Sequence, residues 1–282
     1  MDSMKGKRVI ITGATSGVGA QIAVQLGALG AELVLACRDI EKGATVAGKV
    51  VRGGAATVPV LIQVDLSGQA SIRAFARTFQ ARYDRLDVLV NNAAGNRGQL
   101  PKIDSVDGIE LTFATNVVAY FLLTNELLAL LKKSAPARIV NVASTFASDL
   151  DLDDLQFKKR PFESFKAYAQ SKACNRLLTW ALARRLEGSG VSANAMTPGL
   201  ITETGLYRNA PPELVTRLTQ YSGGRTSAQG ADTAVWLASS GELAGVNGKF
   251  YEERQELPCE FRGEAAEEKL WAICEELVGS GR

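Results

Sequence analysis

Histidine is absent from the 282 residues of the chain. This absence excludes a Ser-His-Asp or Cys-His nucleophile and any histidine-ligated metal, so acid–base chemistry falls to Tyr, Lys, Asp, Glu or Cys. Cysteine is scarce as well, because only Cys37, Cys174, Cys259 and Cys274 occur, with no C-x-x-C pair. They fit neither a zinc site nor a disulfide framework, so we expect no bound metal and a reducing, cytoplasmic location.

A strong charge of one sign and long apolar runs are also missing. Lysine plus arginine is 32 and aspartate plus glutamate is 30, so the net charge of +2 gives no reason to expect a nucleic-acid partner. The first eight residues are polar and do not resemble a signal peptide. The most apolar stretch, Val117–Leu131, contains Asn125 and Glu126 and is too short to cross a bilayer. We therefore expect no membrane partner either.

Short apolar runs alternate with amphipathic helical stretches along the chain. Several of the runs are apolar throughout, as are strands of a parallel sheet that is covered on both faces. The alternation predicts a doubly wound, Rossmann-type α/β fold, in which a parallel seven-stranded sheet carries helices on both faces. The expected strands are Arg8–Thr12, Glu32–Ala36, Val58–Val64, Leu86–Val90, Arg138–Val142, Val191–Ala195 and Lys249–Tyr251.

Two long segments interrupt this alternation. Phe146–Phe165 is acidic and then basic, and Leu200–Arg225 contains Pro211, Pro212, Gly223 and Gly224. Both follow expected strands at the carboxyl edge, where such sheets bind ligands, so we interpret residues 200–225 as a substrate loop. Surface decoration is the alternative. With no repeat or low-complexity tract, residues 1–282 are expected to form a single domain that ends in a helical tail over residues 253–282.

A glycine-rich turn, Thr12-Gly13-Ala14-Thr15-Ser16-Gly17-Val18-Gly19, joins the first expected strand to the first helix. Glycine permits a tight turn and close approach to a pyrophosphate, and the helix N-terminus offers unpaired N–H groups to phosphates. The setting predicts a dinucleotide site, and the alternative is a turn that merely connects two elements. The expected cofactor contacts in the turn are Gly13, Thr15, Ser16, Gly17, Val18 and Gly19.

The end of the second expected strand indicates which dinucleotide binds. An acidic residue there would bind the adenosine 2′-hydroxyl of NAD, but neutral Cys37 occupies the position and Arg38 follows it. A guanidinium suits a 2′-phosphate, which favours NADP(H), with Lys42 in support. Asp39 could instead pair with Arg38 or cap a helix, and Arg38 could be an ordinary surface charge.

Tyr168 is the only one of six tyrosines with a lysine, Lys172, four residues further on. Residues at this spacing share one face of a helix, and a nearby ammonium lowers the pKa of a phenol. Tyr168 could then exchange a proton with a substrate oxygen. The pair alone is weak evidence, because an exposed helix face can carry the same spacing.

Further motifs surround this pair, and together they resemble the short-chain dehydrogenase/reductase family over roughly residues 7–252. They are T-G-x-x-x-G-x-G (Thr12 to Gly19), Asp65-Leu66, N-N-A (Asn91 to Ala93), Asn116, Ser144, Tyr168-Ala-Gln-Ser-Lys172 and Pro198-Gly199. Three phrases resemble the branch of retinol dehydrogenases and light-dependent protochlorophyllide reductases, which prefers NADPH. These are Ala36–Gly43, Phe121–Thr124 and Asp154–Gln156. The long spacing between Ser144 and Tyr168 resembles that branch too.

The resemblance implies roles for these residues. Tyr168 would protonate the carbonyl oxygen in reduction, and Lys172 would lower its pKa and hold the nicotinamide ribose. Ser144 would hydrogen-bond the substrate oxygen, and Asn116 would keep a water near Lys172. The further cofactor contacts that it implies are Asp65, Leu66, Asn91, Asn92, Ala93, Pro198, Gly199, Ile201 and Thr202.

The chain also departs from the branch. Val117 and Thr197 stand where histidines are usual, and we expect no membrane-anchoring N-terminal segment of the kind that animal retinol dehydrogenases usually carry. A retinoid or chlorophyll substrate does not carry over. Glu203 replaces the threonine expected after Pro198, which leaves open whether Thr202 or Thr204 contacts the cofactor.

The predicted function is hydride transfer between NADP(H) and a carbonyl or alcohol carbon, with Tyr168 as acid–base. The substrate is expected to be medium-sized and partly apolar, because the long segments carry Phe146, Phe157, Leu206, Tyr207, Leu214 and Tyr221. The alternative is a non-catalytic NADPH-binding sensor or scaffold, which the intact Tyr–Lys pair disfavours. An epimerase or dehydratase fits the compact length poorly. The resemblance implies a homodimer or homotetramer, for which Leu177, Leu178 and Trp180 could form a contact or face the sheet.

Overall fold

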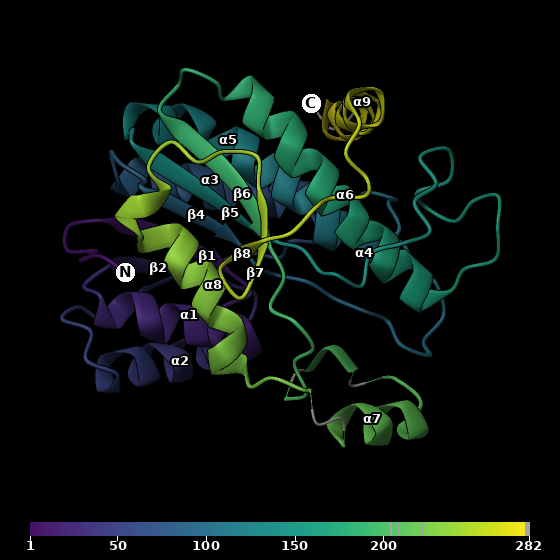
Figure 1. Ribbon diagram of the computed structural model, residues 1–282, viewed down its shortest axis with the longest axis horizontal. Helices are drawn as coiled ribbons and strands as arrows, with labels where there is room; N and C mark the ends of the chain where they lie inside the picture. The colour runs from purple at the N-terminus through teal and green to yellow at the C-terminus, as the bar shows by residue number, and fades with distance from the viewer. Residues whose placement is uncertain (204, 208, 221–222, 280–282) are drawn as a thin grey trace.

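The computed structural model describes residues 1–203, 205–207, 209–220 and 223–279, and its centre is one twisted sheet (Figure 1). The strand order β3-β2-β1-β4-β5-β6-β7-β8 is parallel except for the β7–β8 pair. The strands are β1 (Arg8–Thr12), β2 (Glu32–Cys37), β3 (Val60–Gln63), β4 (Val88–Asn91), β5 (Ala137–Val142), β6 (Val191–Met196), β7 (Phe250–Glu252) and β8 (Gln255–Glu256).

The predicted doubly wound sheet is confirmed, but its strand number was wrong, since the described part of the chain has eight strands instead of seven. The additional strand, β8, returns antiparallel to β7 through Glu253 and Arg254. Both of these residues have positive φ angles, 48° and 63°. Hairpin turns of this kind usually carry Asn or Gly, so the sequence Glu-Arg gives no turn signal.

Helices cover both faces of the sheet (Figure 1). On one face α1 (Gly17–Ala28), α2 (Ile40–Arg52) and α8 (Ser227–Ser239) enclose one apolar core with the sheet. On the other face α3 (Gln69–Arg82), α5 (Ala119–Lys133) and α6 (Ser164–Arg185) enclose a second core.

The C-terminal helix, α9 (Glu264–Gly279), packs on the outer side of α6 (Figure 1). The Trp271 indole meets the Phe121 ring edge to face, with centroids 4.8 Å apart. Leu177, Leu178 and Trp180 of α6 are all buried within the chain. They therefore face its own core and not an outside partner.

The helical stretch that carries Asn116 is longer than the sequence suggested. It runs from α4 (Leu111–Phe113) through a π-helical turn (Ala114–Val118) into α5. Leu111–Lys133 has 23 residues and its most apolar 18-residue window has a mean hydropathy of 1.5, so it is long and apolar enough to cross a membrane, and the length argument from Val117–Leu131 was wrong. Within the protein, 67% of its most apolar window is buried, and the core that α5 forms with α3 and α6 accounts for this apolarity.

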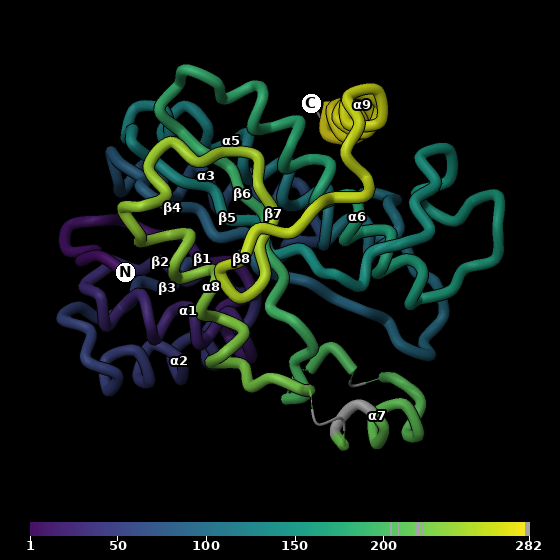
Figure 2. The backbone as a smooth tube through the Cα atoms, in the orientation of Figure 1, coloured from purple at the N-terminus to yellow at the C-terminus, as the bar shows by residue number. Residues whose placement is uncertain are grey.

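The strand order reverses between β1 and β4, because the chain continues from β1 toward β2 on one side and from β4 toward β5 on the other. Such a reversal opens a crevice at the carboxyl ends of the two strands. Both long segments lie at this edge, as predicted (Figure 2). The second contains a short 3₁₀ turn (Gly205–Tyr207) and α7 (Pro212–Thr219), so it is not loop throughout. The two ends of this segment are joined, because the Arg225 N–H donates to the Leu200 carbonyl at 2.8 Å.

The first long segment is ordered by one buried carboxylate. Asp154, which is 5% exposed, accepts backbone N–H bonds from Lys158 (2.6 Å), Lys159 (3.2 Å) and Arg160 (3.1 Å). The Arg160 guanidinium lies 3.5 Å from the same carboxylate and 4.4 Å from the centroid of the Phe157 ring. The acidic-then-basic sequence is therefore a folded loop closed by its own charges.

Asp154→Ala removes the acceptor of three backbone N–H groups at once. We expect the free energy of unfolding to fall by about 3 kcal/mol, because several hydrogen bonds to a charged group are lost together. Urea unfolding measures the change. The neighbouring Asp153→Ala is the control, since that carboxylate is 73% exposed and its ion pair with Lys269 contributes at most about 1 kcal/mol. Equal losses in the two variants would contradict this role of Asp154.

Candidate active site

A cleft of about 860 Å³ lies at the carboxyl edge of the sheet and collects most of the predicted site residues. It extends from the glycine-rich turn and the end of β2 to the two long segments. The predicted residues that line it are Gly13, Thr15, Ser16, Gly17, Val18, Gly19, Arg38, Asp65, Leu66, Asn92, Ala93, Ser144, Tyr168, Lys172, Pro198, Gly199 and Ile201.

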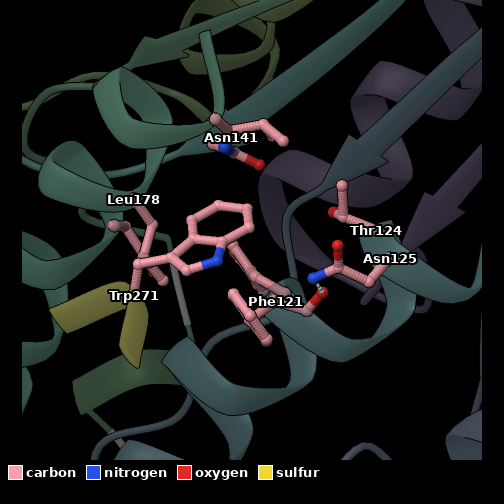
Figure 3. A pocket seen from close by; sticks show the side chains of 9 residues that line it. Phe121, Thr124, Asn125, Asn141, Leu178 and Trp271 are labelled. Carbon is pink, nitrogen blue, oxygen red and sulfur yellow. Dashed lines mark hydrogen bonds between the residues drawn. The ribbon is translucent and has the colours of Figure 1, made fainter. Parts of the chain in front are cut away.

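A second, much smaller cavity lies between α5, α6 and α9 (Figure 3). Trp271 and Phe121, whose rings contact each other, line it together with Thr124, Asn125 and Asn141. Its volume of about 20 Å³ matches roughly one water molecule and is too small for a substrate or a nucleotide. The large cleft is therefore the candidate active site.

The glycine-rich turn is packed so that only glycine fits at two of its positions. A Cβ on Gly13, whose φ is 63°, would lie 2.6 Å from the Ala93 Cα, and a Cβ on Gly19 would lie 2.3 Å from the Asn92 Nδ2. The Thr12 hydroxyl joins this turn to the end of β4 by accepting the Asn92 N–H (2.9 Å). The backbone of the turn is consequently held at the floor of the cleft.

This turn fits the pyrophosphate of a dinucleotide. Ser16 is the N-cap of α1, yet its side chain accepts no hydrogen bond from the helix. The N–H groups of the first turn thus remain available at a cleft-lining helix N-terminus, where the helix dipole favours phosphate. At Gly17, whose φ is 54°, a Cβ would meet no atom within 4 Å, so the space beside the turn is open.

The end of β2 answers the question left open about Asp39. Its carboxylate caps α2 by accepting the Lys42 N–H at 3.0 Å, and it pairs with the Lys42 Nζ at 3.1 Å. Lys42 therefore binds Asp39 and not the 2′-phosphate site that it was predicted to support. Arg38, by contrast, is exposed and lines the cleft. Burial opposes ionisation of Asp65, but hydrogen bonds from Ser67 and the charge of Arg38 lower the pKa of that carboxyl below its ordinary value.

At the other end of the cleft, β5 and α6 bring three predicted catalytic side chains together. Ser144 follows β5, and its side chain shares a hydrogen bond with the Tyr168 hydroxyl. Lys172, one turn further along α6, donates from Nζ to the Val142 carbonyl at 2.8 Å, and Nζ lies 5.7 Å from the centroid of the Tyr168 ring. Tyr168 is 8% exposed and Lys172 is 1% exposed.

Burial sets the ionisation of the Tyr–Lys pair. It lowers the pKa of the Lys172 amine to about 7, and it raises the pKa of the Tyr168 phenol well above its ordinary value, with the nearby Tyr207 adding to the rise. The expectation that Lys172 lowers the pKa of Tyr168 is therefore wrong for this structure. The reason is that a desolvated amine near neutrality is itself only partly charged, so desolvation of the phenol prevails.

Asn116 lies behind the cleft surface, and the water-holding role that the resemblance implies for it stays a prediction. It sits in the π-helical turn, fully buried, and does not line the cleft. Its amide accepts the Gly95 N–H (2.8 Å) and donates to the Gly95 carbonyl and the Ser171 hydroxyl, both at 3.0 Å. Asn116 thus fastens the loop after β4 to the residue that precedes Lys172, and π-helical turns are frequent at functional sites.

Some other predicted residues are not found on the cleft surface. Thr202 does not line the cleft, while Thr204 and Tyr221 lie outside the described residues. Asn91 is buried and donates to Thr124 and Asn141, so it supports the sheet. Of the apolar residues expected at the substrate, Phe157 is buried under Phe162, whereas the others that are described line the cleft. These are Phe146, Leu206, Tyr207 and Leu214.

The sequence analysis missed the lining supplied by the loop after β4 and by the helix that follows it. Asn96, Arg97 and Thr115 line the cleft, together with Asn209 across it. The Gln99 N–H donates to the Asn209 carbonyl at 2.7 Å and so joins the two sides. The signal in the sequence was the position of Asn96 and Arg97 directly after a strand end, where ligands are bound.

Comparison with known proteins agrees with this geometry. A family model described as short chain dehydrogenase matches residues 7–214. Human retinol dehydrogenase 14 is 39% identical over 297 residues, with 98% of this chain and 87% of that protein covered. Mouse retinol dehydrogenase 13 is 38% identical over 287 residues, with 98% and 85% covered.

Two solved structures share the fold. A crystal structure of a protein from Mycobacterium Paratuberculosis has a TM-score of 0.78 and 30% identity, over 99% of this chain and 96% of that one. The Pseudomonas aeruginosa RhlG/NADP active-site complex has a TM-score of 0.71 and 30% identity, over 88% and 94% of the two chains.

The chain therefore belongs to the short-chain dehydrogenase/reductase family. Within the family it falls in the branch of the retinol dehydrogenases, as the sequence phrases predicted. It is accordingly an oxidoreductase of the kind that uses a nicotinamide dinucleotide, NAD or NADP, on a small-molecule substrate.

The depressed pKa of Lys172 predicts a pH-dependent stability. Between pH 7 and 10.5 the unfolded chain holds more protons than the folded one, so the free energy of unfolding rises with pH through that window. Below pH 7 the buried amine is charged in the folded protein, and the full destabilisation from burying that charge is present. Lys172→Met removes this cost. We expect the variant to be more stable than the parent by roughly 3 kcal/mol at pH 6, with the advantage shrinking toward pH 10.

Chemical unfolding from pH 6 to pH 10 measures this difference. Lys166→Met is the control, because that lysine lies on the same helix but is 45% exposed and paired with Glu163. A stability difference for Lys172→Met that does not vary with pH would contradict a buried amine with a pKa near neutrality.

Proposed function

We propose that the protein is an NADP(H)-dependent carbonyl reductase or alcohol dehydrogenase in which Tyr168 is the general acid and base. The observation that carries the proposal is the position of Ser144, Tyr168 and Lys172 in one cleft with the glycine-rich turn. The three side chains and the glycine-rich turn lie at opposite ends of a space of about 860 Å³, which accommodates a dinucleotide together with a further molecule.

The preference for NADP(H) rests on the end of β2. The cleft wall there is formed by Ala36, Cys37 and Arg38, so no carboxylate stands at the strand end to bind a 2′-hydroxyl. Asp39 is turned into the cap of α2, which leaves the Arg38 guanidinium to a 2′-phosphate. The related RhlG complex contains NADP, which supports the same preference.

The side chains of the chain would handle the proton and the developing charge. When bound, the nicotinamide supplies or accepts the hydride. The Tyr168 hydroxyl gives a proton to the carbonyl oxygen, and the Ser144 hydroxyl donates a hydrogen bond to that oxygen as charge develops on it. Lys172, anchored on Val142 beside Tyr168, exchanges a proton near neutral pH because its pKa is about 7.

The substrate end of the cleft favours a medium-sized, partly apolar carbonyl compound. Phe146 is 55% exposed, and its ring stacks on that of Tyr168 with centroids 6.3 Å apart. Leu206, Tyr207 and Leu214 supply apolar surface on the opposite segment. Asn96 and Arg97 add polar groups, so a purely hydrocarbon substrate is not the best fit.

The experiment that tests the proposal is NADPH and NADH consumption across a panel of aldehydes, ketones and quinones. We expect turnover that prefers NADPH and falls by about 1,000-fold or more in Tyr168→Phe, which keeps the ring but removes the proton. The variant should still bind NADPH. Tight NADPH binding without turnover across a broad panel would favour the sensor alternative.

The cofactor preference has its own prediction. Arg38→Leu should weaken NADPH binding by about 30- to 100-fold and leave NADH binding nearly unchanged, because only the former carries a 2′-phosphate. Calorimetric titration of both cofactors measures this. Lys42→Leu is the matched control, because Lys42 pairs with Asp39 and should not bind the 2′-phosphate. A loss of NADPH affinity as large as that of Arg38→Leu would contradict this assignment.

The pKa of Tyr168 predicts how rate depends on pH. Since burial raises that pKa, the phenol is protonated at neutral pH and ready to donate a proton in reduction. Alcohol oxidation needs the phenolate, so its rate should rise with pH from 7 to 10 while carbonyl reduction stays flat and falls only in alkali. Initial rates in both directions check this, and an oxidation rate already constant at pH 7 would contradict it.

A further inference from the structure

Arg176 is a buried arginine for which the proposed chemistry has no use. It lies on α6 one turn beyond Lys172 and is 4% exposed. Its Nε donates to the Ser144 carbonyl oxygen at 3.1 Å, and its Nη2 donates to the same oxygen. One guanidinium thus holds the peptide group of the predicted catalytic serine with two N–H bonds.

No carboxylate in the described ranges lies within 4.0 Å of this guanidinium, and the charges of Glu260 and Glu252 act on it only from a greater distance. It lies over the Phe250 ring of β7, 4.1 Å from the centroid, and 5.5 Å from that of Phe261. It also shares a hydrogen bond with the Cys259 thiol. The segment after β8 thereby covers the guanidinium, and such charge-assisted bonds in a dry setting are strong.

The sheet stops supporting the chain just before Ser144. β5 ends at Val142, and the Ala143 N–H is the last to bond β6, at the Met196 carbonyl (2.8 Å). Beyond that point the Thr145 N–H reaches the Thr197 hydroxyl only at 3.3 Å. The Arg176 bonds are therefore the strong anchor of the Ser144 peptide on its α6 side.

We propose that Arg176 is a positioning residue that holds the backbone of Ser144 so that its hydroxyl faces Tyr168, and that Cys259 and Phe261 keep Arg176 seated. The inference rests on the proposed function for its catalytic consequence, whereas the anchoring itself does not. A misplacement of the hydroxyl by about 1 Å can cost on the order of 100-fold in rate. The tail thus takes part in the site without touching the substrate.

The test compares three variants of the full-length protein. Arg176→Met keeps the length of the side chain but removes every donor, and Arg176→Lys keeps one charged donor. Arg185→Met is the matched control, since that arginine lies on the same helix, stacks on Trp271 and pairs with Glu268 but does not contact Ser144. Hydrogen exchange of the peptide that covers residues 143–147 is measured for each, alongside kcat and the KM for NADPH.

We expect faster exchange at residues 143–147 in Arg176→Met, with the control unchanged. The kcat should fall by about 10- to 100-fold at an unchanged KM for NADPH, and Arg176→Lys should recover part of it. In a Ser144→Ala background, Arg176→Met should cause little further loss, because the group that it positions is already gone.

Three results would overturn the inference. These are unchanged exchange at residues 143–147, an unchanged kcat, and a full additional loss in the Ser144→Ala background. If Arg176→Met does not fold, Arg176→Lys decides alone: it keeps one donor in place of two, so exchange at residues 143–147 should still be faster and kcat lower than in the parent, and wild-type values of both would contradict an anchor made by the two guanidinium bonds. A parent protein without turnover would count against the proposed function, while the exchange measurement would still test the anchor.

Discussion

Lys172 lies on α6, a helix of which 18 of 22 residues are buried, and is itself 1% exposed. Its Nζ donates to the Val142 carbonyl at the end of β5, at 2.8 Å. Burying an amine in this way costs free energy, which the protein limits by lowering the pKa of the amine to about 7. The proposed chemistry depends on this burial, because it places a proton that exchanges at neutral pH beside Tyr168.

Most of the polar groups that this helix buries have hydrogen-bond partners, and Asn175, whose side-chain amide has none, is the exception among its described residues. Ser171 meets Asn116, Gln170 donates to the Leu155 carbonyl, and Arg176 holds the Ser144 carbonyl. Of these partners, Ser144 lines the cleft, Leu155 belongs to the first long segment, and Asn116 holds Gly95 of the loop after β4. The hydrogen bonds that satisfy these buried groups of α6 therefore also position the segments around the site.

The opposite end of the cleft depends on backbone and not on buried charge. Gly13 and Gly19 allow β1, β4 and α1 to approach closely, and the uncapped first turn of α1 faces the space they leave. A helix N-terminus binds phosphate through fixed N–H groups, which need no titration. The cleft thus combines a rigid anion site with a titratable pair.

The sequence predicted whatever is encoded locally. The apolar runs indicated the parallel strands, and the strand–turn–helix setting of Gly13 to Gly19 placed that turn on the cleft. Features set by tertiary contacts were missed. The hairpin at Glu253 and Arg254 lacks a turn residue, and no motif marks Arg176. The direction of the Tyr168 pKa was wrong because spacing along a helix does not reveal desolvation.

The most direct test of the central claim is an NMR titration of the Lys172 amine in protein with isotope-labelled lysines, with its signal assigned by comparison with Lys172→Met. The structure predicts that one lysine titrates with a pKa of about 7 while the exposed lysines remain charged to far higher pH. A titration in which every lysine keeps a pKa near 10 would contradict the account, since the amine beside Tyr168 would then be solvated and permanently charged at neutral pH.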